Sequence, residues 1–126
     1  QNEETSKEPE DFPDSQLKKK RQELEAVILD RILYHHKRTV ENPNKRSEEQ
    51  PLIHQLYKEI TFVRAETGRI ILYIVTSTTR ALEDLWLLSE SGGLTNLFQR
   101  CYVTDELLEM FDLQELQLRV EITKEN

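Results

Sequence analysis

The 126-residue chain is poor in the features that several protein classes require. Its one cysteine, Cys101, excludes an intramolecular disulfide framework and any cysteine-based zinc knuckle. No apolar run approaches the roughly 20 residues that span a bilayer, and the acidic, polar opening residues do not resemble a signal peptide. The net charge of −7 argues against a binder of duplex nucleic acid. The length suits one domain, and we expect that domain to be cytosolic.

Charged side chains are distributed unevenly along the chain. Residues 1–14 have a net charge of −5 and two prolines, and we expect a disordered acidic leader because so few apolar side chains cannot offset the entropy lost on ordering. Residues 15–46 have a net charge of +5. This basic patch could bind RNA or an anionic surface, but its side chains face different sides of a helix, which favours a solvated surface. Its main members are Lys18, Lys19, Lys20, Arg21, Lys37 and Arg38.

Hydrophobic spacing predicts one α+β domain over residues 15–126. Apolar residues recur at helical spacing over 15–40, which predicts a long N-terminal helix. A sheet-containing core follows over 52–126, beginning with a short helix that has Pro51 at its first position. Between residues 58 and 64 the spacing fits both helix and strand, and we expect the helix to pass into a strand there.

The second half of the chain combines apolar strands with capped helices. Residues 69–75 are continuously apolar after Arg69, which predicts a strand that is covered on both faces. Three short helices follow; Thr79 fits best as the N-cap of the first, and Thr104 or Asp105 fits that of the third. Strict alternation over 115–122 predicts a last strand. The final four residues begin a helical pattern, so we expect the domain to be cut off before a last helix.

Residue types that serve catalysis or bind metals do not gather in the sequence. His35 and His36 point about 100° apart on a helix, and we interpret them as polar residues near a helix end, where positive charge suits the dipole. Cys101 lies on an apolar stripe and is interpreted as an inert buried thiol, and Trp86 as a core residue. No nucleophile has a base partner, and no glycine-rich loop could hold a phosphate. The sequence therefore predicts no enzyme, no cofactor and no metal.

The sheet is the better indication of function. If the alternating apolar residues of 115–122 face the helices, the central strand has a second apolar face. Two sets of residues could form that face, either Ile70, Leu72 and Ile74 or Ile71, Tyr73 and Val75. The long N-terminal helix could cover this face. Left open, the face would be a partner surface, or the sheet would have an edge that accepts a strand.

Three strings in the second half, GRIILYIV, ALEDLWLLSESGGLTNLFQRCYVTDELLEMF and ELQLRVEI, are similar to TRADD-type N-terminal domains, those of the tumour-necrosis-factor-receptor-associated death-domain adaptor family. The resemblance covers about Leu56 to Ile122. It implies a ferredoxin-like α/β sandwich in which helices pack on a small antiparallel sheet. It also implies a non-enzymatic recruitment module that binds a TRAF-type ubiquitin-ligase adaptor through its sheet edge and neighbouring loops. Carried over by position, the partner-binding residues would be Phe62, Arg64, Arg69, Tyr73 and Arg119.

We therefore predict a protein-interaction scaffold of cytosolic signalling, of the apoptotic or innate-immune type, that docks a partner through a sheet face or edge. The expected partner is another protein, a TRAF-type adaptor or a homotypic domain, and we expect neither nucleic acid nor a membrane span. One alternative is binding of RNA or an anionic surface through the basic helix. The other is homo-oligomerisation by sheet pairing.

Overall fold

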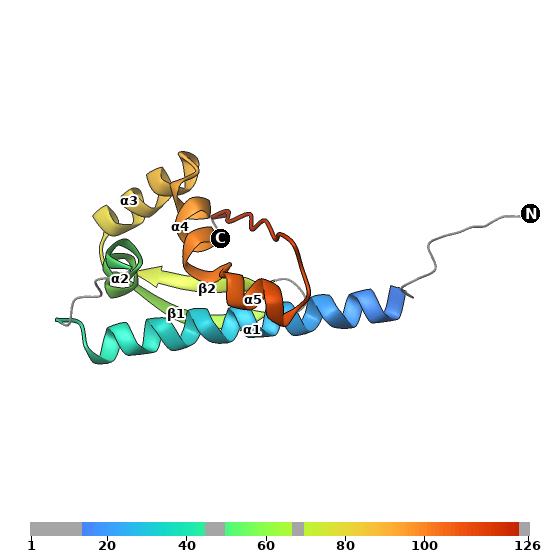
Figure 1. Cartoon of the computed structure of the whole chain (residues 1–126). Coiled ribbons are helices and arrows are strands. Elements are labelled where there is room, and N and C mark those ends of the chain that lie inside the picture. The colour runs from blue at the N-terminus through green and yellow to red at the C-terminus, as the bar shows by residue number, and fades with distance from the viewer. Residues whose placement is uncertain (1–13, 45–49, 67–69, 124–126) are drawn as a thin grey trace, which may run out of the picture.

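The computed structural model describes residues 14–44, 50–66 and 70–123, and within them the protein has an α+β fold (Figure 1). The class, the antiparallel sheet, the packed helices and the long N-terminal helix are as predicted. The expected acidic leader and the expected start of a last helix lie outside the described residues. The elements are α1 (Asp14–Glu41), α2 (Pro51–Lys58), β1 (Ile60–Glu66), β2 (Ile71–Thr76), α3 (Thr79–Glu90), α4 (Gly93–Tyr102) and α5 (Asp105–Met110).

Helix α1 is 28 residues long because its sequence contains neither glycine nor proline. Its buried stripe is narrow and consists of Leu24, Ile28, Ile32 and Thr39. Figure 1 shows α1 running along the whole domain, with its N-terminal turns extending beyond the other helices. Those turns contribute little to the core. Within the described part of the chain, every helix is too short or too polar to cross a membrane.

The core lies where α1, α2 and α4 meet the inner side of the hairpin. Tyr57 and Ile53 of α2 are fully buried, as is Leu107 of α5. Pro51 occupies the first turn of α2 as predicted, where the missing N–H has no helical acceptor to lose. Helix α4 adds Leu94, Leu97 and Tyr102 to the same cluster.

The two strands form an antiparallel hairpin that contains one irregularity. Ile60 lies opposite Thr76 and Phe62 opposite Ile74, but the next pair is Arg64 opposite Tyr73. Val63 is therefore the extra residue of a β-bulge on β1. Residues 58–64, whose spacing fits both helix and strand, belong mainly to β1: α2 ends at residue 58 and the strand begins at residue 60.

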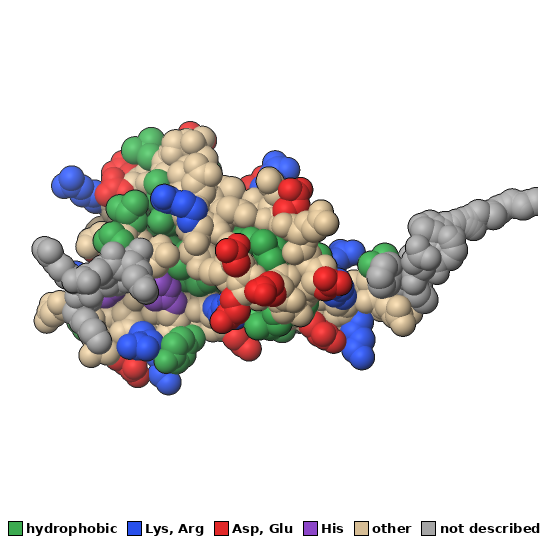
Figure 2. Space-filling model, viewed as in Figure 1, with side chains coloured by type: hydrophobic (Ala, Val, Ile, Leu, Met, Phe, Trp, Pro, Cys, Tyr) green, Lys and Arg blue, Asp and Glu red, His purple; other side chains and the backbone are tan. Residues whose placement is uncertain are grey.

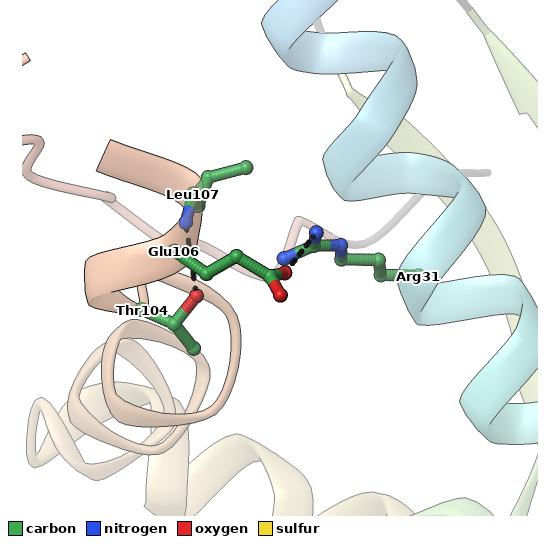
Figure 3. Close-up of polar contacts among 4 residues, drawn as sticks. All are labelled: Arg31, Thr104, Glu106 and Leu107. Carbon is green, nitrogen blue, oxygen red and sulfur yellow. Dashed lines mark hydrogen bonds and ion pairs between the residues drawn. The ribbon is translucent and has the colours of Figure 1, made fainter. Parts of the chain in front are cut away.

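Side-chain caps fix where the later helices begin. The N-cap of α3 is Thr78, whose hydroxyl accepts a hydrogen bond from the Ala81 N–H at 3.0 Å, so the prediction of Thr79 is wrong by one residue. Thr104 caps α5 by accepting from the Leu107 N–H at 3.2 Å. Figure 3 shows this cap beside the ion pair between Arg31 of α1 and Glu106 of α5, whose atoms are 2.9 Å apart.

The last described stretch, residues 113–123 (the C-terminal segment), is extended but is not a strand, so the strand predicted for 115–122 is wrong. Its side chains alternate in burial as the sequence predicts. No strand lies beside it in the described structure; two side chains of α4 take that place. Gln99 and Thr95 hydrogen-bond to its backbone.

Candidate functional site

The outer face of the hairpin is open. Of the two sets of residues that could form it, Ile70, Leu72 and Ile74 pack against the core. The other set points away from the core, because side chains alternate along a strand. Val75 is 57% exposed and Ile71 is 39% exposed, so α1 does not cover this face. We name it the hairpin face and define it by Val63, Arg64, Ile71, Tyr73 and Val75.

A fixed cluster of three side chains lies at the centre of the hairpin face. The guanidinium of Arg64 stacks over the ring of Tyr73, at 3.9 Å from its centroid. The Tyr73 hydroxyl donates a hydrogen bond of 2.9 Å to Glu66, whose carboxylate is also 3.9 Å from the Arg64 guanidinium. The β-bulge creates this contact by bringing residue 64, rather than 63, opposite residue 73.

This cluster adds little to stability, but its side chains already contact one another before a partner binds. An exposed cation–π contact is worth about 0.5–1 kcal/mol, and an exposed ion pair of this length contributes less. Side chains that are already held in place lose less entropy when a partner binds. Exposed Val63 and Val75 flank the cluster with apolar surface.

The structure brings together only two of the five residues carried over from the family resemblance, Arg64 and Tyr73. Phe62 points to the opposite side of the strand, where its ring centroid is 4.6 Å from that of His36 and 6.0 Å from that of Tyr57. Phe62 therefore supports the core beneath the hairpin. Arg69 lies outside the described residues. Arg119 is on the C-terminal segment, where it forms a 2.8 Å ion pair with Glu121.

A half-buried polar cluster between α1 and α4 was missed by sequence reasoning. The His35 Nδ1 is 3.2 Å from the Tyr102 hydroxyl, which is 2.5 Å from the Tyr57 hydroxyl. His36 reaches β1, with its Nε2 2.8 Å from the carbonyl oxygen of Ile60. The two histidines lie near the end of α1, as predicted, and their contacts connect α1 to the rest of the core. The signal was present in Tyr57 and Tyr102, whose hydroxyls need partners when they are buried on apolar stripes.

Burial disfavours the charged forms of four groups in and beside this cluster. Burial lowers the pKa of His35, with smaller contributions from the charges of His54, Arg38 and His36. Burial likewise raises the pKa of Tyr57, of Tyr102 and of the Cys101 thiol. A reactive thiolate is disfavoured in this setting. Among the described residues, no three side chains of the metal-ligating types are placed to hold an ion.

The basic residues of α1 do not form one surface. Lys18 and Lys37 are nineteen positions apart, which is about 28 Å along a helix. Figure 2 shows acidic side chains gathered over α5, beside the middle of α1. One of them, Glu106, neutralises Arg31. The guanidinium of Arg38 is 5.8 Å from the centroid of the Tyr34 ring on its own helix.

Two grooves lie on either side of α3. One, of about 560 Å³, is lined by residues of α2, α3 and α4. The other, of about 760 Å³, lies between β2 and α3 and is lined in part by Leu82, Trp86 and Ile122. Trp86 is 42% exposed there, so its prediction as a core residue is wrong. The core side of α3 is provided by Leu85 instead.

Comparisons with protein-family models, with curated proteins and with solved structures gave no match. The fold and its surface therefore define the class of this chain: an α+β domain whose antiparallel hairpin has an open, partly apolar outer face.

Proposed function

We propose that this protein is a non-enzymatic interaction module that docks a partner protein through the hairpin face. The observation that carries the proposal is the Arg64–Tyr73 stack, held in place and surrounded by exposed valine and isoleucine side chains. Tyrosine and arginine are the residue types that most often dominate binding energy at protein interfaces. An apolar patch with a charged group at its centre suits a partner that offers apolar side chains around a carboxylate.

The finer parts of the proposal come from the family resemblance. They are a cytosolic adaptor role in apoptotic or innate-immune signalling and a TRAF-type adaptor or a homotypic domain as partner. The support that the hairpin face gives to these finer parts is limited to the chemistry of its stacked arginine. An arginine that is stacked on a tyrosine can still donate hydrogen bonds to a partner's acid. The separation of the basic residues along α1 makes binding of RNA or an anionic surface the weaker alternative.

The chain offers a matched pair of variants for the test. Tyr73 and Tyr34 are both tyrosines stacked with an arginine, one on the hairpin face and one on α1. Tyr73→Asp places a charge in the docking surface, and Tyr34→Asp places the same charge elsewhere. We expect a partner captured from cell extract by the wild-type chain to be lost with Tyr73→Asp and kept with Tyr34→Asp, while circular dichroism shows both variants folded. Equal capture by the two variants would refute docking at the hairpin face.

A further inference from the structure

The pattern of backbone hydrogen bonds, rather than the side chains, indicates a second docking surface. We propose that the β2–α3 groove accepts an extended segment of another protein, which pairs with the free edge of β2. The groove is lined by Ile74, Thr76, Leu82, Trp86, Ile122 and Thr123, among others. The inference rests on the proposed interaction function, but it concerns a second surface, which shares only Val75 with the hairpin face, and variants at other positions test each surface without the other.

Within the described residues, no strand pairs with the edge of β2 that faces away from β1. The Ser77 N–H donates to the Glu59 carbonyl at 2.8 Å, so the backbone of residue 77 faces β1. Because backbone groups along an antiparallel strand point alternately to its two sides, those of Ile74 and Thr76 face the opposite edge. The sheet described here has only the strands β1 and β2. The N–H and C=O groups of these two residues are therefore available for pairing.

The C-terminal segment has a free edge of the same kind. Gln99 accepts from the Leu118 N–H and donates to the Leu116 carbonyl, both at 2.7 Å. Thr95 accepts from the Val120 N–H at 3.0 Å and donates to its carbonyl at 3.2 Å. The even-numbered residues thus face α4. The backbone groups of Gln117, Arg119 and Glu121 point the other way, and in the described structure none of these three residues is paired with another backbone group.

The free edge of β2 and the end of the C-terminal segment border one groove. Ile74 and Thr76 line it from β2, and Ile122 and Thr123 line it from the C-terminal segment. An unpaired strand edge is a template for another extended chain. A helix satisfies its own backbone groups, so it could not pair with these edges. The geometry therefore selects a strand as the occupant.

The lining of the groove also restricts the composition of that strand. Exposed apolar side chains of α3, among them Leu82 and Trp86, form one wall. Glu83 is the one charged residue among the described residues that line the groove. A mainly apolar strand with a positive charge at its end fits this surface. The acidic opening residues of the chain itself fit it poorly, because they repeat the charge of Glu83 and include two prolines that cannot donate a backbone hydrogen bond.

Trp86 provides a direct measurement, because it lines the groove and is the only tryptophan in the chain. The probe is a blocked synthetic peptide, Lys-(Val-Thr)₃-Lys, titrated into the full chain. We expect a saturable blue shift of the tryptophan emission and reduced quenching by acrylamide as the peptide covers the indole. The control is the same peptide with its alternate amides N-methylated, which removes the N–H groups that would donate backbone hydrogen bonds to the edge of β2. We expect this control peptide to bind at least about tenfold more weakly.

A pair of variants tests the backbone groups of β2 that would hydrogen-bond to the peptide. Thr76→Pro removes an N–H that faces the free edge and places a ring there, a position at which a strand tolerates proline. Thr76→Ala removes the same hydroxyl and keeps the N–H. We expect the proline variant to lose the fluorescence response and the alanine variant to retain it, with both folded by circular dichroism. If Thr76→Pro fails to fold, the N-methylated peptide decides the question.

Three results would overturn the inference. They are the absence of a tryptophan response to the probe, an equal response to the N-methylated peptide, and a shift of Trp86 emission with protein concentration alone, together with a dimer by sedimentation. The last result would assign the groove to a second copy of this chain. A Tyr73→Asp chain that binds the peptide but no longer captures its cellular partner would separate the two surfaces and support both.

Discussion

The guanidinium carbon of Arg64 lies 3.9 Å from the centroid of the Tyr73 ring, across a hairpin whose register is shifted by one residue. Without the bulge at Val63, residue 63 would lie opposite Tyr73 and Arg64 opposite Leu72. Each side chain on one strand would then meet a different neighbour on the other. A single extra residue in β1 therefore places a planar cation on an aromatic ring at the centre of an open face.

The Arg64–Tyr73 contact leads to a prediction that separates binding from stability. We expect Arg64→Ala to abolish capture of the partner and to change the free energy of unfolding by less than about 1 kcal/mol. Arg64→Lys keeps the charge but not the planar group, so we expect it to restore little binding. Urea denaturation and quantitative capture measure the two effects. A large loss of stability with unchanged capture would show that Arg64 has a structural role instead.

The attachment of the C-terminal segment depends on Gln99. Gln99→Ala removes two hydrogen bonds to the segment, and we expect it to lower the free energy of unfolding by about 1–3 kcal/mol. Amide exchange at Leu118 should become faster at the same time. The matched control is Asn96→Ala, an exposed amide on the same helix. Equal effects of the two substitutions would contradict the proposed attachment.

The hydroxyl of Tyr102 lies between two partners, His35 and Tyr57, whereas within this cluster the hydroxyl of Tyr57 contacts that of Tyr102. We therefore expect Tyr102→Phe to cost more stability than Tyr57→Phe, with each effect on the order of 1 kcal/mol. The two changes together should cost less than their sum, because both remove the same hydrogen bond. Chemical denaturation of the wild-type chain, the two single variants and the double variant gives the coupling energy between the two hydroxyls. Strictly additive losses of stability would rule out the shared hydrogen bond.

The lowered pKa of His35 makes stability depend on pH in a defined direction. In the unfolded chain the imidazole has its ordinary pKa, so between that value and the lower folded-state pKa the unfolded chain binds more protons. This contribution to stability is complete above about pH 6.5 and is lost as the pH falls through the folded-state pKa. We expect the wild-type chain to lose stability as the pH falls below about 6.5. His35→Gln should show a shallower dependence in urea denaturation, and an identical slope would contradict the assignment.

Local patterns in the sequence identified most of the elements, because their causes are local. The β-branched run before Val75, the proline that opens α2 and the hydroxyl that caps α5 each act within a few residues. The cap of α3 was misplaced because Thr78 and Thr79 are chemically equivalent in sequence. Only the backbone conformation decides between them.

The errors have a common origin in contacts between distant residues. The alternation of Leu116, Leu118 and Val120 correctly indicated one buried side, but it could not show that the ladder partner would be a helix carrying Gln99. Helical spacing placed Trp86 on the inner stripe, but Leu85 occupies the core position. Likewise, nothing near His35 in sequence indicated Tyr102 as its partner. These outcomes are set by which elements pack together.

The most direct test of the central claim is hydroxyl-radical footprinting of the chain with and without its captured partner. The rate of oxidation at each side chain reports its exposure to solvent. If docking takes place at the hairpin face, Tyr73 becomes protected in the complex while Tyr34, 60% exposed on α1, keeps its rate. Unchanged oxidation at Tyr73 in a complex that protects Tyr34 or the basic turns of α1 would contradict the account.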